Sequence, residues 1–431
     1  MRVLLGHIRT RCLFLGAILL LAGSLAFEAG KVWLAAHWAG STNPEVWSRA
    51  ARLEADNAEY WHRLGLFAQW DADQGGLRQA ILYYERAIQI NSRSDIYWMD
   101  LASAYESLGN ASGAREAFEH AAASHPASSE VAWRYGGFLL RQENLSRAFA
   151  EFRRALMSDP NLTPSAISQS WKAGESVPRI LNEVLPAESR YYFMALDYFL
   201  SQKQTEAMLT VWDRIVRLRQ PFEMRRIVPF VNELINQDRL EEAQRVWQEA
   251  LSATGWPHQD TGNSSLVFNG GFENELLYGG FDWREEPIPG ASFCFDTSAA
   301  RSGMRSLRIV FDGTGNLDFR NAMQFVPVVP RHRYHFSAYL LTQDISTDSG
   351  IRFAIFDPIH PSLPQLLTPN VVGTQPWSPV VLDFATGPET RLLVIALRRI
   401  PSWKFDNKLR GTVWVDDVSL IPIFGTKDGS P

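Results

Sequence analysis

Cysteine is almost absent from this chain of 431 residues, which contains only Cys12 and Cys294. Because Cys12 lies in an apolar leader, the sequence excludes a disulfide framework and cysteine-based metal sites. Catalytic signatures are missing as well, since there is no His-Glu-x-x-His, no Gly-x-Ser-x-Gly and no glycine-rich phosphate loop. The formal net charge of -5 offers no basic excess for binding nucleic acid. These absences favour a noncatalytic protein that does not bind nucleic acid.

The chain does contain the composition of a globular protein with room for several domains. Hydrophobic residues make up 46% of the chain and charged residues 21%, which is typical of folded rather than disordered proteins. A length of 431 residues is enough for two or three domains. We therefore expect separate hydrophobic cores along the chain.

The N-terminus carries the pattern of an export signal. Three arginines close to the first residue precede an uncharged apolar run over residues 12–27. Residues 24–26 (Ser-Leu-Ala) offer a cleavage site, and cleavage there would release a secreted protein. Alternatively, the apolar character continues to Ala36, long enough for a transmembrane anchor. We expect residues 1–40 to stay attached as a signal anchor. The protein would then be a single-pass protein of a bacterial inner membrane, with its bulk in the periplasm or outside the cell.

Residues 41–160 are organised by a fixed repeat period that aligns small and large side chains. Small residues allow two helices to approach closely, while large ones fill the gaps between them. A period of about 34 residues predicts stacked helical hairpins. The aligned columns are Ala80, Ala114 and Ala148; Tyr84, Phe118 and Phe152; Ala87, Ala121 and Ala155; and Ser92, Pro126 and Pro160.

The repeated unit over residues 95–128 resembles the tetratricopeptide repeat (TPR) family. The resemblance rests on Trp98, Leu101, Ala102, Tyr105, Gly109, Ala114, Phe118, Ala121 and Pro126. It implies an α-solenoid whose first helices line a concave groove that binds a protein partner. Trp133 either faces this groove or returns to the core after a one-residue insertion. The groove residues expected from this register are Ile96, Met99, Ser103, Glu106 and Trp133.

Beyond Pro160 the helical pattern weakens and then gives way to strands. Residues 161–256 are expected to form degenerate TPR-like repeats, and the polar residues 257–265 a linker. Residues 266–424 alternate apolar and polar positions between turns, which predicts an antiparallel β-sandwich followed by a tail over 425–431. The fold class is thus α+β and multidomain. The expected strands are 306–311, 334–341, 351–356, 380–384, 391–398 and 412–420.

The C-terminal region resembles the galactose-binding-like jelly rolls of carbohydrate-binding modules. The motifs are Val-Phe-Asn-Gly-Gly-Phe-Glu at 267–273, Trp283, Tyr-His-Phe-Ser-Ala-Tyr at 334–339 and Val-Trp-Val-Asp-Asp-Val-Ser-Leu at 413–420. Sugar recognition by such a fold combines aromatic plates with polar side chains, and the alternative for each residue is packing in the core or a turn. The candidate plates are Tyr278, Trp283, Trp377 and Trp403, and the candidate polar partners are Arg320, Asn321 and Gln324.

The same resemblance implies a structural calcium ion. In related modules an acidic residue near the opening strand and one in the closing strand hold the ion, which corresponds here to Glu273 with Asp416 or Asp417. Calcium requires six or more oxygen ligands, many from backbone carbonyls. The alternative is that these carboxylates pair with arginines or cap strands.

Together the patterns predict a noncatalytic, membrane-anchored scaffold outside the cytoplasm. Its repeats would bind a protein partner and its jelly roll would contact a polysaccharide, in the assembly or export of a surface polysaccharide. One alternative is a purely structural protein–protein scaffold whose jelly roll binds no sugar. A further alternative is a glycan-processing enzyme whose active site has no recognisable motif.

Overall fold

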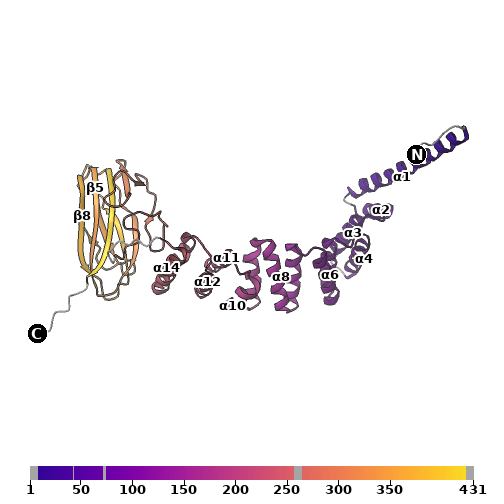
Figure 1. The fold of residues 1–431 in the computed structure, drawn as a ribbon, viewed down its shortest axis with the longest axis horizontal. Coiled ribbons are helices and arrows are strands. Elements are labelled where there is room, and N and C mark those ends of the chain that lie inside the picture. Colours follow the sequence, from indigo (N-terminus) through magenta and orange to yellow (C-terminus); the bar gives the residue numbers. More distant parts are fainter. Residues whose placement is uncertain (1–7, 42, 71–73, 257–264, 424–431) are drawn as a thin grey trace. The chain divides into compact units, whose positions relative to one another are not determined.

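The computed structural model describes residues 8–41, 43–70, 74–256 and 265–423. The chain divides into two compact units, Met1–Ala187 and Glu188–Pro431 (Figure 1). Within the described residues, the first unit is helical and the second contains helices followed by all of the strands. Residues 257–264 of the expected linker and the expected tail 425–431 lie outside the described residues.

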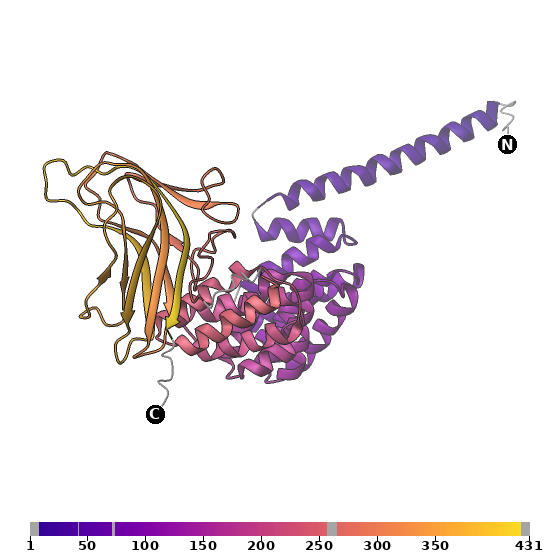
Figure 2. The same cartoon turned by 60° about the vertical axis from the view of Figure 1, so that its left-hand side comes forward.

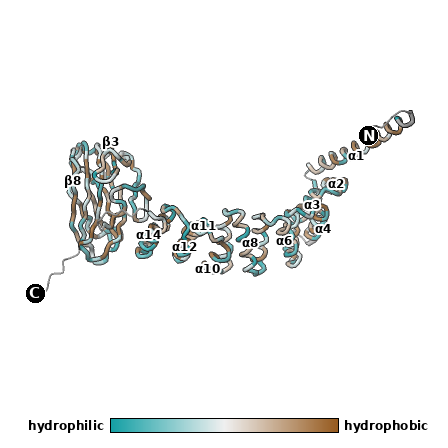
Figure 3. Tube along the Cα trace, viewed as in Figure 1, coloured by the Kyte–Doolittle hydropathy of each residue, from teal (hydrophilic) through white to brown (hydrophobic). Residues whose placement is uncertain are grey.

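The first unit begins with the long helix α1 (Ile8–Ala39), which Figure 2 shows as one straight, uninterrupted helix. Leu13, Leu20 and Phe27 are largely exposed on it, and its N-terminal half is brown in Figure 3. Its last turns are different, because Ala35 and Ala39 are buried in a cluster with residues of the next two helices. By length and composition, residues 11–39 suffice to cross a bilayer, and a signal sequence passes the same test.

The helices that follow α1 in the first unit form antiparallel hairpins, and a more irregular segment ends the unit. The hairpin helices are α2 (Pro44–Leu53), α3 (Ala58–Trp70), α4 (Gln74–Ile90), α5 (Asp95–Ser107), α6 (Ala111–Ser124), α7 (Ser129–Arg141) and α8 (Leu145–Ser158). The irregular segment contains η1 (Pro160–Leu162), α9 (Thr163–Lys172), α10 (Val177–Arg179) and the π-helical turn η2 (Ile180–Val184).

The hairpin formed by α5 and α6 illustrates why this sequence folds as it does. Gly109 has a φ of 78°, a left-handed conformation that ends the first helix at little cost for glycine. Asn110 then caps α6, because its side-chain oxygen accepts a hydrogen bond from the backbone N–H of Gly113 at 3.0 Å. Ala114 is fully buried where the helices meet. In the next hairpin, a Cβ on Gly136 would lie 2.7 Å from the Phe152 ring, so only glycine fits there.

The second unit begins with two further hairpins and continues into two antiparallel sheets. Its helices are α11 (Ser189–Ser201), α12 (Thr205–Leu218), η3 (Met224–Ile227), α13 (Val228–Asn236) and α14 (Leu240–Thr254). One sheet has the order β1-β4-β9-β6-β7 and the other β2-β3-β10-β5-β8. The strands are β1 (Arg284–Glu285), β2 (Ala291–Asp296), β3 (Ser306–Asp312), β4 (Phe319–Pro327), β5 (Arg333–Ile345), β6 (Arg352–Phe356), β7 (Leu366–Leu367), β8 (Gly373–Ala385), β9 (Leu392–Arg399) and β10 (Arg410–Ile423).

The two sheets enclose one apolar core, to which both contribute alternate residues. Fully buried members include Ile309 of β3, Phe336 of β5 and Ile395 of β9. Two antiparallel sheets that do not close into a barrel make a sandwich, so the predicted succession of helical hairpins and antiparallel β-sandwich is confirmed.

Helices α13 and α14 pack directly against the sandwich within the second unit. The Trp247 ring of α14 contacts the rings of Phe268 and Phe281 at centroid distances of 5.3 and 5.8 Å. Asn232 of α13 accepts hydrogen bonds from the backbone N–H of Gly280 at 2.8 Å and from the Arg284 guanidinium at 2.7 Å. These contacts join the last repeats and the sandwich into one unit.

Candidate functional site

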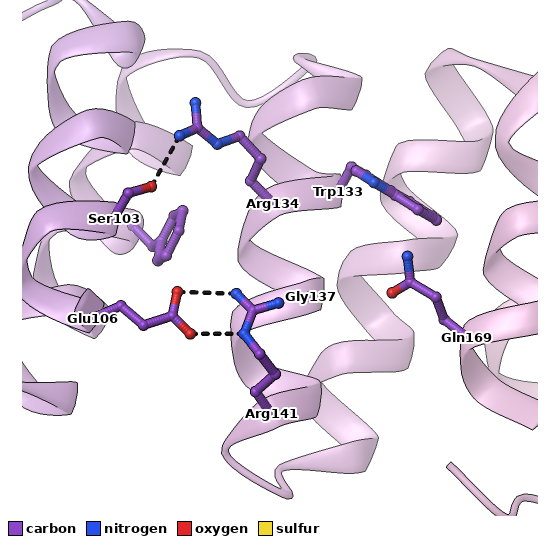
Figure 4. A pocket seen from close by; sticks show the side chains of 8 residues that line it. Ser103, Glu106, Trp133, Arg134, Gly137, Arg141 and Gln169 are labelled. Atoms are coloured by element: carbon purple, nitrogen blue, oxygen red, sulfur yellow. Dashed lines mark hydrogen bonds and ion pairs between the residues drawn. The ribbon is translucent and has the colours of Figure 1, made fainter. Parts of the chain in front are cut away.

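A pocket of about 200 Å³ opens between the first helices of successive hairpins in the first unit (Figure 4). Residues from α5, α7 and α9 form most of its wall, and the ring of Phe118 from α6 completes it. The residues that line it are Ser103, Glu106, Phe118, Trp133, Arg134, Gly137, Arg141 and Gln169. Three of the five residues expected in the groove, Ser103, Glu106 and Trp133, are therefore brought together.

Ion pairs between neighbouring hairpins shape this pocket. Glu106 accepts two hydrogen bonds from the Arg141 guanidinium, at 2.7 and 2.9 Å, and these bonds raise the pKa of Arg141 above its usual value. Arg134 donates to Ser103 at 2.9 Å and to Asp100 at 3.1 Å. Figure 4 shows both arginines extending from α7 toward α5. The wall therefore presents charged groups that are already oriented.

Trp133 lines the pocket and is also half-buried. Figure 4 shows its ring on the side of α7 away from Glu106, near Gln169. The ring centroid lies 5.0 Å from that of Phe152. Because α7 and α8 begin at Ser129 and Leu145, each one repeat period after α5 and α6 begin, no insertion shifts the register at this point. Trp133 thus contributes one part of its ring to packing and another to the pocket.

Two of the expected groove residues have other environments. Met99 is only 1% exposed, so it is a core residue and presents no surface to a partner. Its Sδ lies 4.0 Å from the Arg134 guanidinium of α7, so the next hairpin contacts this side chain. Ile96 is 49% exposed in the first turn of α5 but does not line the pocket.

Sequence reasoning missed Arg134, Gly137, Arg141 and Gln169. The sequence did contain a pattern that indicates Arg134. This residue lies one repeat period after Asp100, and equal positions of adjacent repeats face each other, so the two side chains are expected to pair. Gly137 and Arg141 follow on the same face at i+3 and i+7. Gln169 carried no such signal, since the regular period ends before α9.

The candidate sugar plates of the sandwich occupy four separate segments, and none lines the polar pocket described below. Trp283 is 2% exposed and packs against Phe272 at 5.1 Å, so it is a core residue whose faces are covered. Tyr278 is 52% exposed, with Arg225 over its ring at 5.9 Å. Trp377 is half-buried on β8, whereas Trp403 is 100% exposed in the loop between β9 and β10.

The candidate polar partners also differ in exposure. Gln324 is fully buried, and its amide holds the backbone of Phe268 through two hydrogen bonds of 2.8 and 2.9 Å. This arrangement leaves Gln324 as a structural residue with no group facing solvent. Arg320 is exposed on β4 and its neighbour Asn321 is half-buried.

The expected calcium residues Glu273, Asp416 and Asp417 do converge around Gly271. Asp416 accepts hydrogen bonds from the backbone N–H groups of Arg301 at 2.8 Å and Ser302 at 3.2 Å. Asp417 accepts from the Arg301 guanidinium and, at 2.6 Å, from the Ser302 hydroxyl.

Glu273 is occupied in the same way, because its Oε1 accepts from the backbone N–H groups of Met304 at 2.9 Å and Arg305 at 3.3 Å. N–H donors and a guanidinium surround these carboxylates where a cation would need oxygen ligands. Among the described residues, no group of three or more His, Cys, Asp or Glu side chains is arranged for a metal ion. The residues present therefore do not fit calcium.

A polar pocket of about 550 Å³ lies beside these carboxylates. The Arg301 guanidinium covers the ring of Tyr339 in its wall, 3.4 Å from the ring centroid. Four serines also line it, and the Ser419 Oγ is buried without a hydrogen-bond partner among the described residues. The pocket wall therefore contains both hydrogen-bond donors and hydrogen-bond acceptors.

Residues 67–129 and 99–163 match the tetratricopeptide repeat family, so the first unit carries TPR repeats. No curated protein matches the chain. The Arabidopsis OM64 TPR domain is a similar solved structure, with 22% identity, a TM-score of 0.23, and coverage of 24% of this chain and 84% of that chain.

Two further solved structures are similar to parts of the chain. The first TPR of Spaghetti (RPAP3), bound to the HSP90 peptide SRMEEVD, is 20% identical over 28% of this chain and 94% of that chain, with a TM-score of 0.25. A structure described as CBM4 structure and function is 16% identical over 36% of this chain and 99% of that chain, with a TM-score of 0.28.

Proposed function

We propose that this protein is a noncatalytic scaffold whose TPR repeats bind a protein partner in the pocket between α5, α7 and α9. The observation that carries the proposal is the set of oriented polar groups, Ser103, Glu106, Arg134 and Arg141, around a hollow of about 200 Å³. A hollow of this volume accommodates one side chain or chain end of a partner rather than a whole small-molecule cofactor. In this proposal α1 anchors the scaffold in a membrane. The scaffold then acts in the assembly or export of a surface polysaccharide.

Site-specific photocrosslinking in cells that express the full chain tests the proposal. The photoreactive residue p-benzoylphenylalanine replaces Gln169, which lines the pocket. The matched control carries the same residue at Ser124, which is exposed at the end of α6 and outside the pocket. We expect a discrete crosslinked product containing a second protein from position 169 alone. No product from position 169, or equal products from both positions, would contradict the proposal.

We also propose that the sandwich contacts carbohydrate, with Trp403 as the plate. The supporting observation is the complete exposure of the Trp403 side chain on a loop held at its base. There the Ser402 hydroxyl donates to Asp348 at 2.6 Å, and the buried Arg399 guanidinium donates to the carbonyl of Asn407 at 2.9 Å. The loop backbone is held while both faces of the indole are left free to stack on the C–H face of a sugar ring.

A glycan array probed with the detergent-solubilised full chain tests the carbohydrate proposal. We expect dissociation constants of about 10 μM to 1 mM, because a single stacked ring must offset a large ordering cost. Binding should be lost in Trp403→Ala and kept in Trp70→Ala, which removes another exposed tryptophan, 86% exposed. If a broad array retains no glycan, the carbohydrate proposal is wrong, and the purely structural protein–protein scaffold is the remaining interpretation.

A further inference from the structure

A second pocket in the first unit, of about 510 Å³, lies between α4, α5 and α6. It uses Trp98, Leu101 and Tyr105 of α5, whereas the groove pocket uses Ser103 and Glu106 of the same helix. The helical repeat of about 3.6 residues places these two sets on different faces of α5. The second pocket is therefore separate from the groove.

Two carboxylates and an apolar wall characterise this second pocket. Glu85 accepts a hydrogen bond from the Tyr105 hydroxyl at 2.9 Å, and Glu116 lies on α6 in the same lining. Burial first, then the hydrogen bond and charge of Glu85, raise the pKa of Tyr105 to about 12. The wall is made by Ile88 and Leu101 together with the Trp98 ring.

No cation of the described chain neutralises these carboxylates. Neither Glu85 nor Glu116 forms an ion pair with any lysine, arginine or histidine among the described residues. Arg86 is adjacent in sequence but donates to Gln89 at 3.1 Å instead. The stacked ring of His120, 4.4 Å from that of Trp98, closes one side of the tryptophan. The pocket thus combines negative charge, an aromatic wall and open volume.

In the next repeat, Glu119, which is equivalent to Glu85, is paired with a guanidinium. Glu119 accepts a hydrogen bond from Arg147 at 3.0 Å and another from the Tyr135 hydroxyl at 3.2 Å. The Arg147 guanidinium also donates to that hydroxyl at 3.1 Å and lies 5.9 Å from the centroid of the Tyr135 ring. The hydrogen bond to Glu119 raises the pKa of Arg147 above its usual value.

A shift of one repeat period toward the N-terminus maps this closed site onto the open pocket. Glu119 corresponds to Glu85 and Tyr135 to Leu101, and Arg147 corresponds to Gly113. All three of these earlier residues line the open pocket. The carboxylate is thus retained while the arginine that satisfies it one repeat later is replaced by glycine.

We propose that the pocket at Glu85, Trp98 and Glu116 binds the guanidinium group of an arginine side chain that a protein partner presents. The aliphatic stem would lie along Ile88 and Leu101, with the guanidinium at Glu85 where Arg147 lies in the next repeat. Arginine fits better than lysine, because its planar group forms parallel hydrogen bonds to a carboxylate and stacks on aromatic rings.

The test uses Nα-acetyl-arginine amide as the probe and the full chain in detergent as the receptor. Saturation-transfer-difference NMR detects weak binding through the resonances of the probe. Nα-acetyl-citrulline amide is the matched control ligand, since it has the same shape without the charge. We expect clear saturation of the arginine side-chain methylenes and a signal at least about fivefold weaker for citrulline.

Two variants locate the binding. Glu85→Gln should weaken binding about tenfold, because it removes the charge-assisted hydrogen bond. Gly113→Arg should weaken binding by supplying the guanidinium within the chain, and Gly113→Ala controls for the crowding of Asn110, which a Cβ there would approach to 2.7 Å. The matched control Glu119→Gln alters the closed site and should leave probe binding unchanged. Equal signals for the two ligands, no signal at all, or binding that Glu85→Gln does not change would each overturn the proposal.

Discussion

Two tryptophans of the sandwich have the same chemistry and opposite surroundings. Trp283 is 2% exposed in the core, and Trp403 is 100% exposed on a loop. Each was a candidate sugar plate from sequence, but only the exposed ring has free faces. Burial of this kind depends on which loop covers which strand, and no local pattern in the sequence encodes it.

Substituting each tryptophan by alanine separates the two roles. Trp283→Ala should lower the free energy of unfolding by about 3–5 kcal/mol, because it leaves a large cavity. Trp403→Ala should change it by no more than about 0.5 kcal/mol, since it removes only exposed surface. Thermal melting of the full-length variants checks both. A destabilised Trp403→Ala would contradict the exposed assignment.

Two buried carboxylates predict how the second unit responds to pH. Burial raises the pKa of Asp282 from 3.8 to about 7 and that of Asp416 from 3.8 to about 6. The folded state therefore binds these protons more tightly than the unfolded state. Their contribution to stability is complete below about pH 4 and is lost as the pH rises through 6 and 7.

We accordingly expect the free energy of unfolding of the second unit to fall between about pH 4 and about pH 7. The slope for each titrating group is at most about 1.4 kcal/mol per pH unit. Urea unfolding at several pH values measures it. Asp282→Asn should flatten the curve most clearly between about pH 6 and about pH 7, where the Asp416 carboxyl is already largely ionised, and a stability that rises between about pH 4 and about pH 7 would refute the assignment.

At the scale of single elements, the regular helices followed directly from the sequence and some strands did not. The fixed repeat period requires no knowledge of distant contacts, because each hairpin repeats the same local packing. The six strands expected from alternation all appear. By contrast, β4 has a register irregularity between Phe319 and Ala322 that interrupts its alternation. The register of β10 against β5 also shifts between Asp416 and Ser419. This shift lies at Asp416 and Asp417, whose hydrogen-bond partners were not predicted.

The small-residue contact inside each hairpin is testable at Ala114. This residue is 0% exposed between α5 and α6, so Ala114→Leu should overpack the hairpin and cost about 1–3 kcal/mol. Ala123→Leu is a matched control on the exposed side of the same helix and should be nearly neutral. Chemical denaturation of both variants gives the comparison. Equal stabilities would reject the packing assignment.

At the scale of the whole molecule, the chain contains a long apolar helix, TPR repeats and a sandwich joined to the last repeats. The groove pocket was predicted in part because Ser103, Glu106 and Trp133 follow from repeat register. The repeat period also indicates the pairing of Arg134 with Asp100, whereas Arg141 and Glu106 are 35 residues apart and do not occupy equal positions of the repeats. The sugar-stacking aromatic residues of the sandwich were harder to predict than the groove residues, because loops between strands decide their exposure.

The fate of the leader decides whether the scaffold is anchored. Because α1 runs without interruption from Ile8 into the buried Ala35 and Ala39, we expect residues 1–26 to remain attached. Mass spectrometry of the native protein should show the intact N-terminal peptide in the membrane fraction. A mature N-terminus at Phe27 would end the anchor hypothesis and leave export intact.

The central claim is that the pocket between α5, α7 and α9 binds a protein, and filling it tests that claim most directly. Gly137 lines the pocket, and outside its own helix backbone a Cβ built there contacts, among the described residues, the Arg141 side chain at 3.4 Å. The measurement is the yield of crosslinked partner from a photoreactive residue at position 169, with and without Gly137→Leu. We expect Gly137→Leu to reduce the yield about tenfold, equivalent to about 1.4 kcal/mol of binding, while the variant stays folded. An undiminished yield in the folded variant would contradict it.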